Sequence, residues 1–146
     1  MLQRMSTHHI DEVAEIHKTS WDKTEISVKL GHDYIKMFYD YIVKSEYSFG
    51  FVYLFDKKVI AYATGFSDYQ AFNKFFKKQN FFYLLIILKK RIVLGKMGFG
   101  DLINLLNDSK KFKKSKYSKY HLGSLALSNV YKGKSIGRQA ITDVIG

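Results

Sequence analysis

Apolar residues recur along the first third of the chain with the spacing of helices. In residues 8–21 they return every three or four positions, which predicts an amphipathic helix whose start Thr7 would cap. A second stripe of the same kind predicts a helix over residues 28–44. Residues 1–6 precede both and predict a short strand at the edge of a sheet. The inner face of the first helix comprises Ile10, Val13, Ala14 and His17.

The period then changes to that of strands. Residues 48–55 (SFGFVYLF) and 59–66 (VIAYATGF) are dense in aromatic and β-branched residues, and only three residues separate them, which predicts a hairpin. Residues 120–128 (YHLGSLALS) predict a further buried strand, and a helix is expected to begin near Ser135 soon after it. The inner side of that helix is predicted to carry Ile136, Ala140, Ile141 and Val144.

Between the hairpin and the last strand lies a long segment with helical spacing. It extends over residues 69–118, breaks at the glycines of residues 95–100 and ends in the basic run of residues 110–119. The segment is too long to be a connecting loop. Aromatic and basic blocks alternate in residues 72–91, where we favour an insertion helix that packs on its own domain over one that faces a membrane or nucleic acid.

The composition is that of one globular domain spanning residues 1–146. Of these residues, 47% are hydrophobic and 16% aromatic. The chain contains no cysteine, which excludes disulfides, thiolate metal sites and a cysteine nucleophile. The first residues lack an apolar signal core, and the longest apolar run, residues 81–88, is shorter than a spanning helix. We therefore expect a cytoplasmic protein without a membrane span.

Most of the net charge of +11 falls on one segment. Residues 67–119 contain thirteen lysines and arginines against three aspartates, whereas the rest of the chain is close to neutral. Such a segment attracts anions, whether a phosphorylated cofactor, acidic lipid headgroups or nucleic acid. The plainer alternative is a lysine-rich solvated surface.

One stretch, LSNVYKGKSIGRQA (127–140), has the composition of a phosphate-binding turn. The N–H groups at a helix start lack acceptors and share the positive end of the helix dipole, so they bind anions. Gly133 lets the main chain approach such an anion closely. The dinucleotide-binding pattern needs a third glycine besides Gly133 and Gly137, and the P-loop pattern needs a glycine where Ser128 stands. Both motifs are therefore disfavoured, and a glycine turn without a ligand is the remaining alternative.

Residues 125–137, LALSNVYKGKSIG, resemble the most diagnostic stretch of the Gcn5-related N-acetyltransferase family. There a strand ending Leu-x-Val is followed by His-Pro-x-Tyr and by Arg-Gly-Lys-Gly-Ile-Gly at a helix start. Here Lys132 replaces the usual Arg or Gln, Ser135 the first motif glycine and Asn129 a frequent proline. The resemblance implies a mixed α/β sheet flanked by helices, the N-terminal portion of the acyl-coenzyme A N-acyltransferase fold, with residues 67–119 as a basic helical insertion between strands three and four.

The resemblance also implies a function, the direct transfer of an acetyl group from acetyl-coenzyme A to an amine on a small molecule or a peptide. It implies that backbone N–H groups of residues 132–137 hold the pyrophosphate while Lys134 and Arg138 supply charge. The main chain of Leu125 and Leu127 would pair with the pantetheine arm, and an N–H there would help to hold the developing oxyanion. The implied cofactor-binding residues are Leu125, Ala126, Leu127, Lys132, Gly133, Lys134, Ser135, Ile136, Gly137 and Arg138.

The same resemblance points to His121 as the catalytic base. Some members of the family carry a carboxylate four residues before the Leu-x-Val start, and His121 occupies that position. In a regular strand residues 121, 123 and 125 share one face. The alternatives are that His121 only packs against Tyr120 or Tyr62, or that Asp68 is the base. No metal is expected, because His8, His9, His17 and His32 do not have metal-ligand spacing.

The family's fold continues beyond the helix that starts near Ser135, with another parallel strand. We therefore expect a second copy of the chain, or a further segment, to complete the sheet beside residues 120–128.

Two other functions remain open. One is a non-catalytic acyl-coenzyme A-binding or assembly module, and the other is a peripheral binder of anionic membranes or nucleic acid through residues 69–119. Among the partners, nucleic acid is disfavoured.

Overall fold

The computed structural model describes residues 1–107 and 120–145, so the basic run 110–119 lies outside the described residues. At its centre is an antiparallel sheet with the strand order β1-β2-β3-β4, which makes the protein a mixed α/β protein. The four strands expected from the hydrophobic pattern are confirmed, with β1 and β4 at the edges of this sheet. They are β1 (Leu2–Arg4), β2 (Ser48–Phe55), β3 (Lys58–Phe66) and β4 (His121–Leu127). The expectation that the last strand is buried was wrong, because only Ser124 and Ala126 of β4 are buried.

A tight turn joins β2 to β3. Asp56 and Lys57 form it, with φ angles of 49° and 63°. Two consecutive positive φ angles are typical of a type I′ turn, whose twist matches that of a hairpin. The predicted hairpin is confirmed, and Lys58 belongs to β3 because it pairs with Phe55.

The helices between β1 and β2 differ in their bounds from the predicted ones. Thr7 is not a cap, because residues 7–9 form a 3-10 turn and α1 (Ile10–Ser20) begins only after it. The helix predicted over residues 28–44 is two helices, α2 (Ile26–Leu30) and α3 (His32–Lys44). The break falls at Gly31, whose φ of 96° no helix accommodates.

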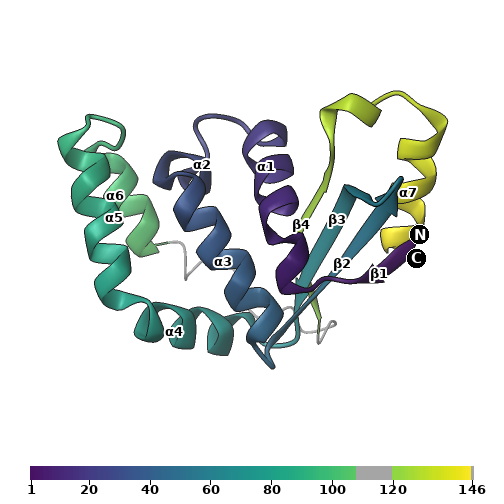
Figure 1. Cartoon of the computed structure of the whole chain (residues 1–146). Helices are drawn as coiled ribbons and strands as arrows, with labels where there is room; N and C mark the ends of the chain where they lie inside the picture. Colours follow the sequence, from purple (N-terminus) through teal and green to yellow (C-terminus); the bar gives the residue numbers. More distant parts are fainter. Residues whose placement is uncertain (108–119, 146) are drawn as a thin grey trace.

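Each face of the sheet is buried by different helices (Figure 1). On one face, α1 and α3 pack on Val52, Tyr62 and Phe66. On the other, α7 (Ser135–Ile145) packs on β3. Strand β3 is therefore buried from Val59 to Phe66. As predicted, the residues that α7 turns inward are Ile136, Ala140, Ile141 and Val144.

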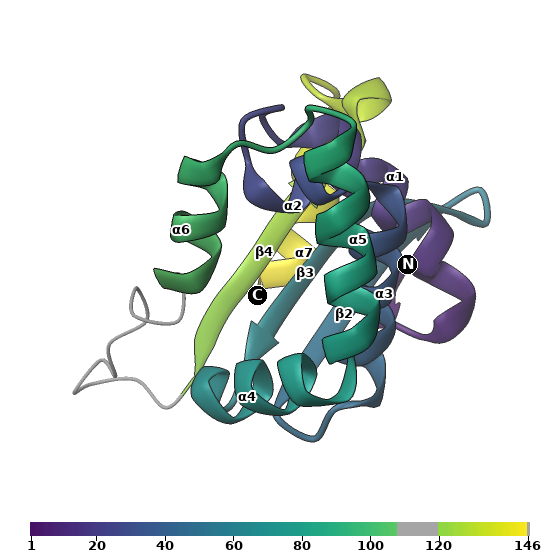
Figure 2. The ribbon, with the colours of Figure 1, turned by 90° about the vertical axis from the view of Figure 1, so that its left-hand side faces the viewer.

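The segment between β3 and β4 forms three further helices. They are α4 (Tyr69–Gln79), α5 (Phe81–Val93) and α6 (Phe99–Asn107). The interruption predicted at residues 95–100 is confirmed, whereas the break at Asn80 between α4 and α5 was not predicted. Helices α5 and α6 lie on the outer side of α3, and Figure 2 shows them in front of the sheet with α7 behind it.

Contacts with α2 fix this helical segment in place. Leu30 packs with Ile87 of α5 and with Met97. The Lys29 ammonium lies 2.7 Å from the Asp101 carboxylate of α6, and Arg91 Nε donates a 3.0 Å hydrogen bond to the Leu30 carbonyl. Within the described residues, no helix combines the length and apolar character needed to cross a membrane.

The start of α7 depends on a close approach that only glycine permits. A Cβ on Gly137 would lie 2.4 Å from the Tyr131 carbonyl oxygen and 2.9 Å from the Leu127 side chain. We expect Gly137→Ala to lower the free energy of unfolding by about 2 kcal/mol, because a carbonyl cannot move aside cheaply. Urea denaturation measures this. Gly100→Ala is the control, since its Cβ would meet nothing; equal stability of both variants would contradict the prediction.

Candidate functional site

Strand β4 has one edge that pairs with no described strand. The Ser128 N–H donates to the Ile60 carbonyl of β3 at 2.8 Å. Because N–H and C=O groups alternate in direction along an antiparallel strand, those of Leu125 and Leu127 point away from β3. The Leu127 carbonyl accepts a 3.1 Å hydrogen bond from the Ser20 hydroxyl. The Leu125 main chain and the Leu127 N–H are thus directed to the free edge.

The turn after β4 leaves a set of backbone N–H groups without acceptors. Residues 129–131 form a 3-10 turn, and the N–H groups of Lys134, Gly137 and Arg138 donate to nearby carbonyls. Those of Gly133, Ser135 and Ile136 donate to no other described residue. The sequence predicted that the N–H groups of residues 132–137 bind the pyrophosphate. Three of these groups are therefore available as donors.

Three basic side chains belong to this turn and to the first residues of α7. Lys132, Lys134 and Arg138 are all exposed. The Lys134 ammonium lies over the Tyr131 ring, 5.4 Å from its centroid. Gly133 has a φ of 76° and open space where a Cβ would point, so the main chain is accessible there. The turn therefore combines helix-terminal donors with positive charge, the two features of an anion site.

His121 does not share a face with Leu125 as a regular strand would require. The register of β3 and β4 shifts between Thr64 and Gly65, so that Ser124 pairs with Thr64 and His121 with Phe66, while Gly123 is the extra residue of a bulge. Paired residues face the same side of a sheet. Half-buried His121 therefore faces α1 and α3, whereas Leu125 faces α7.

A cavity of about 630 Å³ lies on that same face of the sheet. Its floor includes Gly123 and Ser124 of β4, and α1, α2 and α3 contribute one wall. Helices α4, α5 and α6 contribute the opposite wall. His121 is not among the residues that line it. The cavity has the size typical of small-molecule sites.

A hydrogen-bonded cluster of buried polar side chains lies beside this cavity. His17 Nδ1 is 2.7 Å from the Tyr39 hydroxyl and 3.2 Å from that of Tyr62, and the two hydroxyls are 2.8 Å apart. The Ser124 hydroxyl lies 3.2 Å from Tyr39 and 2.7 Å from the Thr64 hydroxyl. His17 and Ser124 also line the cavity, so the cluster connects the sheet with the space where a ligand would lie.

Burial keeps this cluster neutral. Burial lowers the pKa of His17 to about 4, and it raises the pKa values of both Tyr39 and Tyr62. At neutral pH the imidazole is therefore uncharged and the phenols stay protonated. His17 Nε2 completes its hydrogen bonding with the Ser27 hydroxyl at 2.8 Å. Such a cluster can position hydrogen-bonding groups without bringing a charge into the cavity.

Trp21 adds an indole to this end of the cavity. Its ring stacks on His17, with the ring centroids 5.4 Å apart and the ring planes inclined by 20°. The indole Nε1 is buried and lacks a hydrogen bond of acceptable geometry within the described residues. It nevertheless lies close enough to the Tyr62 hydroxyl to favour the phenolate and so to lower that group's pKa, against the larger effect of burial. Trp21 therefore belongs to the polar cluster and also lines the cavity.

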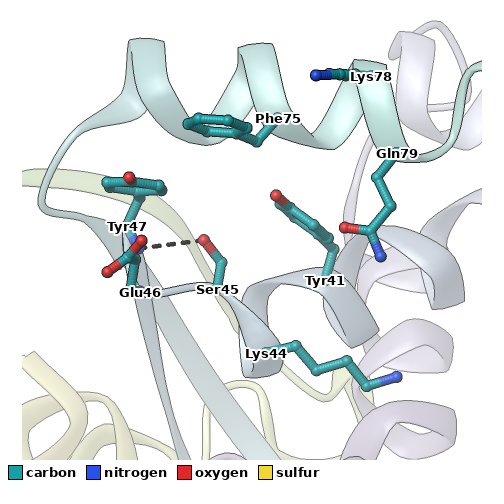
Figure 3. Close-up of a pocket in the computed structure, with 8 residues that line it drawn as sticks. All are labelled: Tyr41, Lys44, Ser45, Glu46, Tyr47, Phe75, Lys78 and Gln79. Atoms are coloured by element: carbon teal, nitrogen blue, oxygen red, sulfur yellow. Dashed lines mark hydrogen bonds between the residues drawn. The ribbon is translucent and has the colours of Figure 1, made fainter.

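A second hollow, of about 590 Å³, lies between the end of α3 and α4 (Figure 3). Tyr47 and Phe75 stack at one side of it, with ring centroids 5.6 Å apart. Lys44 is paired with Asp40 at 2.6 Å, and Lys78 and Glu46 bring opposite charges to the rim. This hollow therefore offers no concentration of one charge and no buried polar cluster, and it is the weaker candidate.

The remaining sequence candidates have structural roles. The Asp68 carboxylate accepts the Ala71 N–H at 3.0 Å and so caps α4. In the part of the chain that the structure describes, no group of three or more histidine or acidic side chains could hold a metal ion. Comparison of the chain with protein-family models, curated proteins and solved structures found no match.

Sequence reasoning missed the polar cluster. It treated His17 as a surface or packing residue, considered Tyr62 only as a packing partner of His121, and did not single out Tyr39, Thr64 or Ser124. One signal was present, since Tyr62 and Thr64 alternate with Phe66 on one face of a strand that is otherwise apolar. Polar atoms on a buried face require internal partners.

We expect His17 to make stability depend on pH. Its pKa falls from 6.5 unfolded to about 4 folded, so its contribution is complete above pH 6.5 and is lost as the pH falls toward 4. The loss amounts to about 3 kcal/mol. Urea denaturation of wild type and His17→Gln at several pH values measures this, with His8→Gln, an exposed site, as control. An unchanged pH dependence in His17→Gln would contradict the expectation.

Proposed function

We propose that the protein is an N-acetyltransferase of the Gcn5-related type that takes its acetyl group from acetyl-coenzyme A. One observation carries the proposal: the free edge of β4 leads directly into the N–H groups at the start of α7. Main-chain groups without a hydrogen-bond partner among the described residues therefore follow one another from β4 to the start of α7. A pantetheine arm can pair with Leu125 and Leu127 while its diphosphate accepts from Gly133, Ser135 and Ile136.

The proposed reaction forms one bond and breaks another. The nitrogen of a neutral amine attacks the thioester carbonyl, a C–N bond forms and the C–S bond breaks. The proton that the amine nitrogen loses passes to the catalytic base and from it to the leaving thiolate. The Leu125 N–H, directed to the free edge, would donate to the oxyanion that develops. Because most of these contacts come from the main chain, few side chains are needed to hold the cofactor.

His121 is our proposed catalytic base. It lies on the strand that would bind the thioester and faces the same side of the sheet as Ser124, whose side chain lines the cavity. His17 is a poor base, because a pKa of about 4 leaves it too weak to take a proton near neutral pH. Its proposed part is to fix the Tyr39 and Tyr62 hydroxyls.

A second candidate function is attachment to anionic membranes. Helices α4 and α5 contain six basic residues and no acidic one. Large apolar side chains beside these charges face solvent, with Phe82 80%, Val93 77% and Phe99 78% exposed. Exposed apolar side chains on a helical segment whose charge in α4 and α5 is entirely basic match both the apolar interior and the negative charge of an anionic lipid surface. Such attachment is compatible with acetyl transfer.

The proposed cofactor contacts can be tested through one main-chain proton. Proline is tolerated at the first position of a helix, so Ser135→Pro removes the Ser135 N–H with little effect on α7. We expect acetyl-coenzyme A to bind in the micromolar range and Ser135→Pro to weaken binding by about tenfold, the value of one charge-assisted hydrogen bond. Calorimetric titration measures both.

The matched control is Ser135→Ala, which keeps the N–H and should bind as the wild type does. The proposal fails if the wild type gives no binding heat at millimolar ligand, or if the proline and alanine variants bind equally. Binding without thiol release across a panel of amines would instead favour the non-catalytic binding module.

Membrane attachment predicts sedimentation with vesicles that contain phosphatidylglycerol. Retention should be lost on vesicles of phosphatidylcholine alone and should fall sharply at about 0.5 M salt. The double variant Phe82→Asp/Val93→Asp should bind at least about tenfold more weakly, since both side chains would leave the lipid. Val130→Asp, on an exposed residue of the turn before α7, is the control. Retention that is insensitive to salt and to the double variant would exclude this function.

A further inference from the structure

The cavity against β4 has walls of mixed chemistry that indicate what it would bind. Phe81 and Leu85 of its outer wall are 54% and 48% exposed, whereas Phe66, Phe72 and Phe76 form the packed base beneath the space and are 2%, 1% and 3% exposed. Their rings contact one another, with the centroids of Phe66 and Phe72 4.7 Å apart and those of Phe72 and Phe76 5.9 Å apart. This part of the cavity suits a flat or branched apolar group.

The polar end of the cavity offers hydrogen bonds and little charge. There the Ser27 and Ser124 side chains and the Trp21 indole ring line the space, and His17 between them is neutral. Among the described residues that line the cavity, Glu25 and Lys77 carry formal charge, and Glu25 is exposed. A polycation would find one carboxylate here, too few partners for several ammonium groups.

This environment also affects the protonation of a bound amine. Removal of an ammonium group from water disfavours its charged form, so an amine held among these aromatic rings has a lowered pKa. The neutral form is the one that attacks a thioester. Since Ser124 precedes Leu125 on β4, an amine at the polar end lies beside the strand along which we place the pantetheine arm.

We propose that this cavity binds a primary amine carried on an aromatic or branched apolar body, with the amine at the end formed by Ser27, Ser124 and Trp21. The further statement that this amine is the acetyl acceptor rests on the proposed function. The binding of the amine does not require acetyl-coenzyme A. Peptide lysines and polyamines, which carry their amines on long polar or charged chains, are not the ligands this cavity fits.

The chain contains a built-in probe of this cavity. Trp21 is its single tryptophan and lines the polar end. Titration with phenethylamine should give a saturable change in tryptophan emission, whereas spermidine at the same concentrations should give none. Equal or stronger saturation by spermidine, or no saturation by phenethylamine, would overturn the proposal.

Two neighbouring residues of α5 supply a matched pair of variants. Leu85 lines the cavity and is 48% exposed, whereas Ile86 does not line it and is 63% exposed. Leu85→Asp should weaken phenethylamine binding by about tenfold or more, because it places a carboxylate against the apolar body of the ligand. Ile86→Asp should bind as the wild type does. Equal effects of both variants would overturn the assignment, and circular dichroism verifies that each is folded.

An assay of thiol release from acetyl-coenzyme A separates this proposal from the proposed function. If phenethylamine binds but no amine is acetylated, the acetyltransferase proposal fails and the ligand class stands. If spermidine or a lysine peptide is acetylated and phenethylamine is not, the ligand class fails and the acetyltransferase stands. Acetylation of phenethylamine that Leu85→Asp impairs and Ile86→Asp does not would support both.

Discussion

The structure depends on one constraint, the burial of β3 on both faces. From Val59 to Phe66 no residue of this strand is exposed, because α7 covers one face and α1 with α3 the other. The side toward α7 carries the small Ala61 and Ala63, which lets the helix approach closely. The opposite side carries the polar atoms of Tyr62 and Thr64, which have to find partners inside the protein. His17, Tyr39 and Ser124 supply those partners, and so the neutral cluster beside the cavity follows from the way the sheet is buried.

The two ends of β4 contribute to two different parts of the candidate site. Its later half provides main-chain groups at a free edge and leads to the start of α7. Its earlier half, at Gly123 and Ser124, forms the floor of a cavity that the helices between β3 and β4 close from outside. A ligand that needs both a phosphate-binding turn and an apolar enclosure would find the two within one strand's length, which is what brings cofactor and acceptor together in our proposal.

Local patterns predicted the elements better than they predicted the site. The alternation of residues 48–66 and the glycine stretch after residue 127 led to the correct strands, turn and final helix, since each signal lies within a few neighbouring residues. The helix breaks at Gly31 and Asn80 were not predicted, because the apolar spacing continues through both residues. The cavity was not predicted for a different reason. Its lining comes from eight separate elements, α1 to α6, β3 and β4, so no window of sequence contains it. Main-chain groups at Gly133 and Leu125 were foreseen as binding groups, but that role remains a prediction.

The bulge at Gly123 has a consequence for how this strand can change. One extra residue reverses the parity of the strand, so His121 and Ser124 face the same layer although an odd number of positions separates them. Insertion or deletion of a single residue elsewhere in β4 would exchange inward and outward side chains along the whole remaining strand. The bulge at Gly123 already exchanges the two faces, and it does so only for the residues of β4 that precede Gly123. Substitutions before the bulge can therefore alter the layer around the cavity while the register of the half that enters α7 stays as it is.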